Sequence, residues 1–267
     1  MGKDSAIEWT HHTFNPWWGC TKVSPGCANC YAESFDKRLG GKHWGPGSER
    51  KMFGDKHWDA PLKWNADAAK RGVRERVFCA SMADVFEDRE DLLEPRARLW
   101  TLVAKTPHLD WLLLTKRPEK AEALWLGAHI DAFDGAESLG LTWRPNVWVG
   151  ATMENQEQAD IRAPLLSMVP ARIVFVSMEP LLGPIEINPR HRLDWVIVGG
   201  ESGAGARRMN PEWARSVRDQ CKELGIPFHF KQWGQHDELG VRVGKTAAGR
   251  VLDGRTWDEF PRPVVAV

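Results

Sequence analysis

Six short apolar runs are spaced along the chain, and each ends in polar or glycine residues. They cover residues 77–80, 111–114, 147–150, 173–176, 195–198 and 228–230. Helix-like segments stand between them at 91–104, 119–126, 156–167 and 211–224, the last with Asn210 as N-cap and Pro211 at the first helical position. Uniformly apolar runs are typical of strands buried on both faces of a parallel sheet. The alternation predicts an α/β fold, a full or partial (β/α) TIM-like barrel with parallel strands, with an open doubly wound sheet as the alternative.

Polar residues follow every one of these runs, and three runs end in a similar tetrapeptide. The three are Ser81-Met82-Ala83-Asp84, Thr152-Met153-Glu154-Asn155 and Ser177-Met178-Glu179-Pro180. The others end in Thr115-Lys116-Arg117, Gly199-Gly200-Glu201-Ser202 and Lys231-Gln232-Trp233. Ligands of α/β sheets and barrels bind at the carboxyl ends of the strands, so we expect a shared site there. The alternative is that these residues are polar because loops are exposed to water.

Two regions depart from the alternation. Residues 40–65 are rich in Gly, Lys, His and Trp, which predicts an irregular excursion that serves as a lid or binding loop. Residues 234–267 contain short runs and the turn pair Asp253-Gly254, which indicates a small hairpin that covers one end of the barrel. We therefore expect a barrel over 1–233, with the insertion at 40–65, and a carboxyl-terminal cap over 234–267.

Charge and hydropathy bear on location and partners. Lys+Arg and Asp+Glu both number 36, so the net charge of zero does not by itself indicate a nucleic-acid-binding protein. The first ten residues lack the apolar centre of a signal peptide, and no apolar run is long enough to span a membrane, so we expect a cytoplasmic protein. The 15 Trp residues, against one Tyr, are expected mostly in the core.

Three of the five cysteines lie close together, at Cys20, Cys27 and Cys30. Pro25-Gly26 turns the chain between them, so their sulfurs can converge on one point. Three thiolates can hold a [4Fe-4S] cluster and leave one iron open. In a radical S-adenosylmethionine enzyme that iron binds the cofactor, and the reaction yields a 5'-deoxyadenosyl radical. Cys79 and Cys221 are expected to be buried structural thiols.

Several motifs carry a resemblance to a known family. They are Asn15-Pro16-Trp17-Trp18-Gly19-Cys20, the three-cysteine segment, Thr115-Lys116-Arg117-Pro118, Gly199-Gly200-Glu201-Ser202-Gly203 and Lys231-Gln232-Trp233-Gly234. The chain resembles an uncharacterised phage and bacterial three-cysteine family whose members resemble radical S-adenosylmethionine barrels. The resemblance implies a [4Fe-4S] cluster at the three cysteines, S-adenosyl-L-methionine and an external electron donor, and it names no substrate. The chain departs from the common radical pattern in the spacing of six after Cys20 and in Asn29, where an aromatic is usual, with Tyr31 two positions later.

Roles follow for the strand-end residues if this model holds. The expected catalytic residues are Glu154, Glu179, Glu201 and Lys116. The expected cofactor-binding residues are Tyr31, Ser81, Asp84, Thr152, Asn155, Ser177, Gly199, Gly200, Ser202 and Lys231. For Asn155 and Ser202 helix capping is the alternative. The cations Lys116, Arg117 and Lys231 indicate a carboxylate or phosphate ligand, with internal ion pairing as the alternative.

The preferred substrate is nucleic acid or a nucleotide. The supporting residues are Lys70-Arg71, Arg74, Arg76 and Arg207-Arg208 with Trp44, Trp58 and Trp64, although a solvated charged face would contain the same residues. Two other functions stay open. One is a zinc-stabilised nucleic-acid-binding protein without catalysis, in which His11, His12 or His43 completes the site. The other is a metal-assisted hydrolase that uses the strand-end carboxylates.

Overall fold

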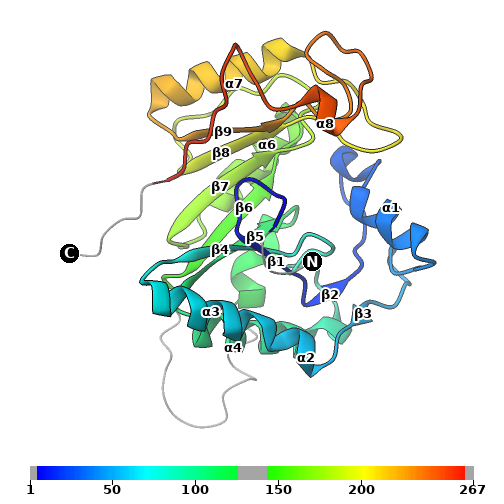
Figure 1. Cartoon of the computed structure of the whole chain (residues 1–267), viewed down its shortest axis with the longest axis vertical. Coiled ribbons are helices and arrows are strands. Elements are labelled where there is room, and N and C mark those ends of the chain that lie inside the picture. The colour runs from blue at the N-terminus through cyan, green and yellow to red at the C-terminus, as the bar shows by residue number, and fades with distance from the viewer. Residues whose placement is uncertain (1–4, 126–142, 262–267) are drawn as a thin grey trace. The chain divides into compact units, whose positions relative to one another are not determined.

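The fold is described from a computed structural model, in which residues 5–125 and 143–261 are described. Its main sheet has seven strands in the order β1-β4-β5-β6-β7-β8-β9 (Figure 1). The strands are β1 His12–Phe14, β4 Glu75–Cys79, β5 Leu109–Thr115, β6 Val147–Thr152, β7 Ile173–Met178, β8 Trp195–Gly199 and β9 Phe228–Gln232. The pairs β1/β4, β4/β5, β7/β8 and β8/β9 are parallel. The order never reverses, as it would in a doubly wound sheet, so the predicted fold class, a partial (β/α) barrel, is confirmed.

The chain divides into two compact units. Among the described residues, unit 1 contains 5–23, 30–125, 143–150 and 168–172, and unit 2 contains 24–29, 151–167 and 173–261. The predicted boundary between residues 233 and 234 stays a prediction. No helix within 5–125 and 143–261 is long and apolar enough to cross a membrane.

Unit 1 contains the strands β1, β4 and β5. Its helices include α1 Tyr31–Arg38, α2 Asp55–Trp58, α3 Ala60–Arg71 and α4 Leu93–Lys105, with short 3-10 turns at Glu90–Leu92 and Pro118–Lys120. Helix α3 packs against α4 and β5. The core is rich in large aromatics, such as Trp125 and Trp143, whose rings stack at 4.5 Å. Of the helix predicted at 119–126, residues 121–125 are helical, and residue 126 lies outside the described residues.

The segment predicted as an irregular excursion contains regular elements. Strand β3, Lys51–Met52, pairs antiparallel with β2, Trp17–Trp18, and α2 and the start of α3 also fall within 40–65. Trp58 and Trp64 are buried, and Trp64 stacks on His12 at 4.4 Å between ring centroids. Thirteen of the 15 Trp residues are buried, so their abundance reflects core packing.

Unit 2 is built on β7, β8 and β9, and every residue of β7 and β8 is buried. Helices α6 Gln156–Ser167, α7 Pro211–Leu224 and α8 Lys245–Ala248 belong to it, and α7 packs against β8 and β9. Helix α7 starts as predicted, because the Asn210 side chain accepts a hydrogen bond from Glu212 N at 3.0 Å. The predicted turn Asp253-Gly254 is present, with φ of 52° and 79°. The chain beyond it runs antiparallel to β9, where Phe230 N donates to Trp257 O at 3.0 Å.

Candidate functional site

The three clustered cysteines lie on the segment between β2 and α1, which contains the 3-10 turn η1, Pro25–Cys27. Cys20 and Cys30 belong to unit 1, and Cys27 to unit 2. All five cysteines of the chain are described, and all are free thiols. Cys20, Cys27 and Cys30 are partly exposed, whereas Cys79 and Cys221 are fully buried, as predicted.

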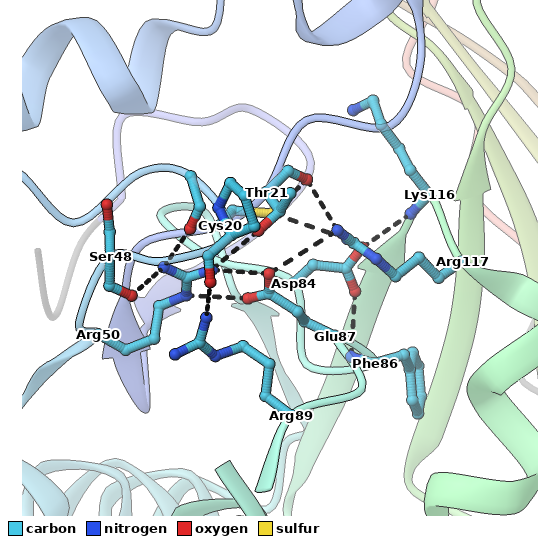
Figure 2. Close-up of polar contacts among 12 residues, drawn as sticks. Cys20, Thr21, Ser48, Arg50, Asp84, Phe86, Glu87, Arg89, Lys116 and Arg117 are labelled. Atoms are coloured by element: carbon cyan, nitrogen blue, oxygen red, sulfur yellow. Dashed lines mark hydrogen bonds and ion pairs between the residues drawn. The ribbon is translucent and has the colours of Figure 1, made fainter. Parts of the chain in front are cut away.

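A cation lies next to the sulfur of Cys20. Arg117, just after β5, places Nη1 3.7 Å from Cys20 Sγ and donates from Nη2 to Thr21 O at 2.7 Å (Figure 2). Burial raises the pKa of the Cys20 thiol to about 12, and the nearby Asp84 carboxylate adds to this, while Arg117 opposes it. The apo thiol is therefore protonated at neutral pH, and Arg117 stabilises the thiolate whenever the proton leaves.

Asp84 is a buried hub at the end of β4 in unit 1. Its carboxylate accepts hydrogen bonds from Phe86 N at 3.0 Å, Thr115 Oγ1 at 2.7 Å, Lys116 N at 3.1 Å and Arg117 Nη1 at 2.9 Å. Burial is the largest influence on the pKa of Arg117 and lowers it, but the charges of Asp84 and Glu87 and the contact with Cys20 together outweigh burial and raise the pKa. Arg117 therefore forms an internal ion pair, which was the alternative to binding an anionic ligand. The Lys116 side chain extends away from Asp84 (Figure 2).

Two further expected residues of unit 1 contact each other near Asp84. The Tyr31 hydroxyl, at the start of α1, donates to Ser81 O at 2.7 Å. Ser81 Oγ accepts a hydrogen bond from Asn15 Nδ2 at 3.0 Å. The same Asn15 accepts from Met82 N through its Oδ1 at 2.7 Å. Asn15 therefore fixes the turn after β4.

A second buried ion pair, Arg50 with Glu87, was not predicted. The Arg50 side chain is fully buried and donates to both Glu87 oxygens, from Nη2 at 2.7 Å and from Nε at 3.0 Å (Figure 2). It also donates to Thr21 Oγ1 at 3.0 Å, and to the carbonyls of His43, Gly45 and Ser48. Arg50 thereby ties the 43–48 turn to the residue that follows Cys20.

In unit 2, Glu154 at the end of β6 contacts the segment that carries Cys27. Its Oε1 accepts a hydrogen bond from Gly26 N at 2.8 Å, and its Oε2 accepts from Arg162 Nη1 at 2.8 Å. Arg162, on α6, also donates to Thr152 O at 2.8 Å. Glu154 is fully buried, and a buried carboxylate is costly without a partner of opposite charge. Arg162 provides that partner.

Glu201, just after β8, holds the same segment at a second point. Asn29 Nδ2 donates to Glu201 Oε2 at 3.1 Å and to Gly205 O at 2.6 Å. Arg207 donates to Glu201 from its backbone N at 2.7 Å and from its guanidinium, and its Nη2 also reaches Pro25 O at 3.1 Å. Burial acts against the charge, but the hydrogen bonds from Arg207 and Asn29 lower the pKa of Glu201, so it is ionised.

The third acid of unit 2, Glu179, pairs with a lysine. Lys231 Nζ, on β9, donates to both oxygens at 2.7 and 2.8 Å, and Gln232 Nε2 donates to Oε1 at 3.1 Å. Gln232 Nε2 also donates to Ser202 Oγ at 2.9 Å, while its Oε1 is buried and has no partner among the described residues. The Lys231 and Glu179 side chains are 13% and 19% exposed, so this pair is more open than Glu154 with Arg162. Gln232 belongs to the motif Lys231-Gln232-Trp233-Gly234, but nothing in the sequence predicts a role for it.

Three of the expected residues have simple local contacts. Asn155 Oδ1 accepts from Gln158 N at 3.0 Å, so Asn155 does cap α6. Ser177 is buried and its carbonyl accepts from Met153 N. Gly200 N donates to Gln232 O at 2.9 Å.

The expected residues thus form two sets, each within one unit. Unit 1 brings together Cys20, Cys30, Tyr31, Ser81, Asp84 and Lys116. Unit 2 brings together Cys27, Thr152, Glu154, Asn155, Ser177, Glu179, Gly199, Gly200, Glu201, Ser202 and Lys231.

Most residues expected to contact nucleic acid are engaged within the protein. Trp58 and Trp64 are buried. Arg71 pairs with Glu75, Arg74 with Asp110, and Arg207 with Glu201. In this conformation the two Trp rings cannot stack on bases, and these arginines already have carboxylate partners.

Within the described residues, no three His, Cys, Asp or Glu side chains are grouped to hold a metal ion. Three free and partly exposed thiols do lie between positions 20 and 30, and thiolates are the ligands that iron-sulfur clusters take. Of the histidines considered for zinc, His11 accepts from Arg76 N and His12 bonds Glu75. His43 bonds Asp36 through Nδ1 at 2.8 Å, which is the arrangement common for a histidine that binds metal through Nε2.

The fold and these residues define an α/β protein of partial-barrel topology with a three-cysteine segment after its first strands and polar residues at its strand ends. Residues 4–261 match the model of a family described as "Protein of unknown function (DUF5131)", and the chain belongs to this family. A search of curated proteins finds no match.

Among solved structures, a point mutant of spore photoproduct lyase is similar, with 10% sequence identity and a TM-score of 0.47. The match covers 84% of this chain and 64% of that one, so the chain spans less than two thirds of that protein's length.

Proposed function

We propose that the chain is a radical S-adenosylmethionine enzyme in which Cys20, Cys27 and Cys30 bind a [4Fe-4S] cluster. The observation that carries the proposal is the set of three free thiols between positions 20 and 30, directly after β1 and β2 and just before α1. Three cysteine ligands leave one iron of such a cluster open. Four thiols, or three with a histidine, would instead close a zinc site.

When bound, the cluster and S-adenosylmethionine supply a 5'-deoxyadenosyl radical that removes a hydrogen atom from the substrate, given an electron from an external donor. The chain's own part begins with the Cys20 proton, which must leave before the sulfur can bind iron. Burial disfavours that loss, whereas the Arg117 guanidinium 3.7 Å away favours it. Asp84 holds Arg117 in this position.

Glu179, Lys231 and Gln232 support the binding of a polar cofactor in unit 2. The partly open ion pair offers a carboxylate for an amino group or hydroxyls and an ammonium for a carboxylate. The buried Gln232 Oε1, which lacks a partner within the described residues, offers an acceptor for a hydroxyl group. S-adenosylmethionine carries all of these groups.

The test is metal analysis of protein purified without oxygen. We expect close to four iron and four sulfide per chain, brown colour that fades on reduction, and 5'-deoxyadenosine after addition of dithionite. The Cys27→Ala variant should lose iron and 5'-deoxyadenosine together. Cys221→Ala, which removes a buried thiol of the same unit, is the matched control and should keep both. Iron that persists in Cys27→Ala would contradict the proposed cluster.

The proposed substrate class is nucleic acid or a nucleotide. It is supported by the exposed cations Lys70 and Arg208 and the half-buried Trp44, while Trp58 and Trp64 give it no support. Single-stranded and duplex DNA and RNA would be titrated at several salt concentrations, because phosphate contacts make affinity fall with salt. If none of these nucleic acids binds even at low salt, nucleic acid is not the substrate class.

A zinc-stabilised protein without catalysis is the second candidate, favoured by the Asp36–His43 hydrogen bond. It predicts colourless protein with one zinc per chain. His43→Asn would then lower zinc content, whereas an iron-sulfur protein should keep its iron in this variant.

A further inference from the structure

The segment Ser24–Asn29, which carries Cys27, is fixed to unit 2 through backbone and side-chain hydrogen bonds. Just before Cys27, Gly26 N donates to Glu154 Oε1 at 2.8 Å. Just after it, Asn29 Nδ2 donates to Glu201 Oε2 at 3.1 Å. The two acids come from the ends of β6 and β8, so Cys27 is bracketed by two contacts whose acceptors are far away in the sequence.

Each of these carboxylates is held by an arginine of the same unit. Arg162 takes the second oxygen of Glu154, and Arg207 takes both oxygens of Glu201. Arg207 also donates to Pro25 O at 3.1 Å, which gives the segment a third point of attachment. A carboxylate locked by a cation is a fixed acceptor, and buried charge-assisted hydrogen bonds of this kind are among the stronger ones in proteins.

The packing leaves no room for a side chain at two glycines. A Cβ on Gly26 would lie 2.9 Å from Glu154 Oε1, and a Cβ on Gly205 would lie 2.7 Å from Asn29 Oδ1. At Gly183, in the same unit, a Cβ would meet only an ordinary contact at 3.7 Å. The close approach at the first two glycines shows that the segment is fitted to its acceptors on both sides of Cys27.

We propose that Glu154 and Glu201 are positioning residues, which fix the Ser24–Asn29 segment so that Cys27 is presented for cluster binding. This inference rests on the proposed function, and it gives the two glutamates a task other than proton transfer to substrate. It also explains why both lie at strand ends, since that is where their oxygens meet the cysteine segment. Glu179, whose hydrogen bonds go to Lys231 and Gln232 of β9, serves as the contrast.

The experiment measures hydrogen exchange of the full-length chain and, separately, its hold on iron. In metal-free protein we expect Glu201→Gln and Asn29→Ala to speed exchange in peptides spanning 24–29 by ~10-fold, the effect of losing one hydrogen bond to a charged group. Gly205→Ala should act in the same direction by displacing Asn29. Glu179→Gln and Gly183→Ala are the matched controls and should leave these peptides unchanged. Peptides of β8 should exchange as in the wild type, which excludes general unfolding.

In reconstituted protein, Glu201→Gln and Asn29→Ala should lose iron to a chelator ~10-fold faster than the wild type, and Glu179→Gln should not. Glu154→Gln should behave as Glu201→Gln does, and Asn29→Ala, at a partly exposed residue, keeps the test valid if that buried substitution prevents folding. Unchanged exchange at 24–29 would overturn the inference, as would faster exchange with iron held as in the wild type. A wild-type chain without iron would instead remove the proposed function, and exchange alone would then decide whether the glutamates fix the segment.

Discussion

Asp84 in unit 1 and Glu179 in unit 2 stand at the ends of similar strand sequences, yet their surroundings differ. Asp84 accepts four hydrogen bonds, three of them from the consecutive residues 115–117, and its side chain is 7% exposed. Glu179 is engaged by Lys231 and Gln232 of β9 and is 19% exposed. Asp84 thus joins one strand end to the next inside its unit, while Glu179 keeps an outward face that a ligand can reach.

The difference shows what the repeated tetrapeptide encodes. The methionines of the three copies, Met82, Met153 and Met178, are all buried, so the repeat specifies a core position at each strand end. The acid follows two residues after Met82 but one residue after Met153 and Met178. Its partners are set by whatever lies beside that particular strand, and the sequence repeat therefore does not imply a repeated role.

The largest expected effect is in unit 1. Asp84→Asn removes the carboxylate from the buried Arg117 and should lower the free energy of unfolding by about 3–5 kcal/mol, the cost of leaving a buried charge without its partner. Urea unfolding followed by tryptophan fluorescence measures this. If Asp84→Asn lowered the free energy of unfolding no more than breaking the Glu179–Lys231 pair does, the contrast between the two units would be wrong.

A smaller effect is expected in unit 2. Lys231→Met leaves Glu179 with Gln232 and partial access to water, so the free energy of unfolding should fall by about 1.5–3 kcal/mol. The same urea experiment applies, with Lys222→Met on α7 as a surface-lysine control. If Lys231→Met lowered the free energy of unfolding as much as Asp84→Asn does, the Lys231–Glu179 pair could not be described as open to water.

The smallest effect concerns the pH dependence of stability, which is expected to differ between the two units. Burial lowers the pKa of His57, with the hydrogen bond to Asn15 O acting against it, and burial likewise lowers the pKa of His11 in unit 1. Because the folded pKa lies below the unfolded value of 6.5, stability is full above that pH and falls as pH drops through the folded value. Glu201, whose pKa is lowered from 4.5, loses its contribution only at more acidic pH.

We therefore expect the urea midpoint to fall between about pH 7 and about pH 5.5, and to fall less in His57→Phe. The variant keeps an aromatic ring between Phe14 and Phe53, which stack on His57 at 4.8 and 4.4 Å. An equal fall in both proteins would assign the acid sensitivity to other groups.

The sheet could be predicted because its strands are apolar throughout. Every residue of β6, β7 and β8 is buried, and such runs have few alternatives to a central parallel strand. Helices α2 and α3 were missed, because Trp58, Pro61 and Trp64 sit in a stretch of Gly, Lys and His that has no clear helical period. Trp64 stacks on His12 and Trp58 contacts Phe14, both in β1, and no local pattern encodes these ring contacts.

The sequence predicted that the polar residues of the site lie at strand ends, but it did not predict their hydrogen-bond and ion-pair partners. Strand-end residues such as Asp84, Glu154 and Glu201 were identified because the carboxyl ends of parallel strands share one edge. Their partners were not, since Asn29 is 172 residues from Glu201 and Arg50 is 37 from Glu87. Hydrogen bonds across such separations leave no spacing signal in a single sequence.

The run antiparallel to β9 has a consequence for the behaviour of the protein in solution. An edge strand with free backbone groups can recruit a strand from another molecule. Here Trp257 and Glu259 occupy those groups, and Trp257 is buried with the Arg255 guanidinium 3.4 Å from its ring centroid. If proteolysis between Asp253 and Trp257 released this run, the backbone groups of β9 would become free to pair with another molecule. Protein cleaved there should therefore aggregate more than intact protein does.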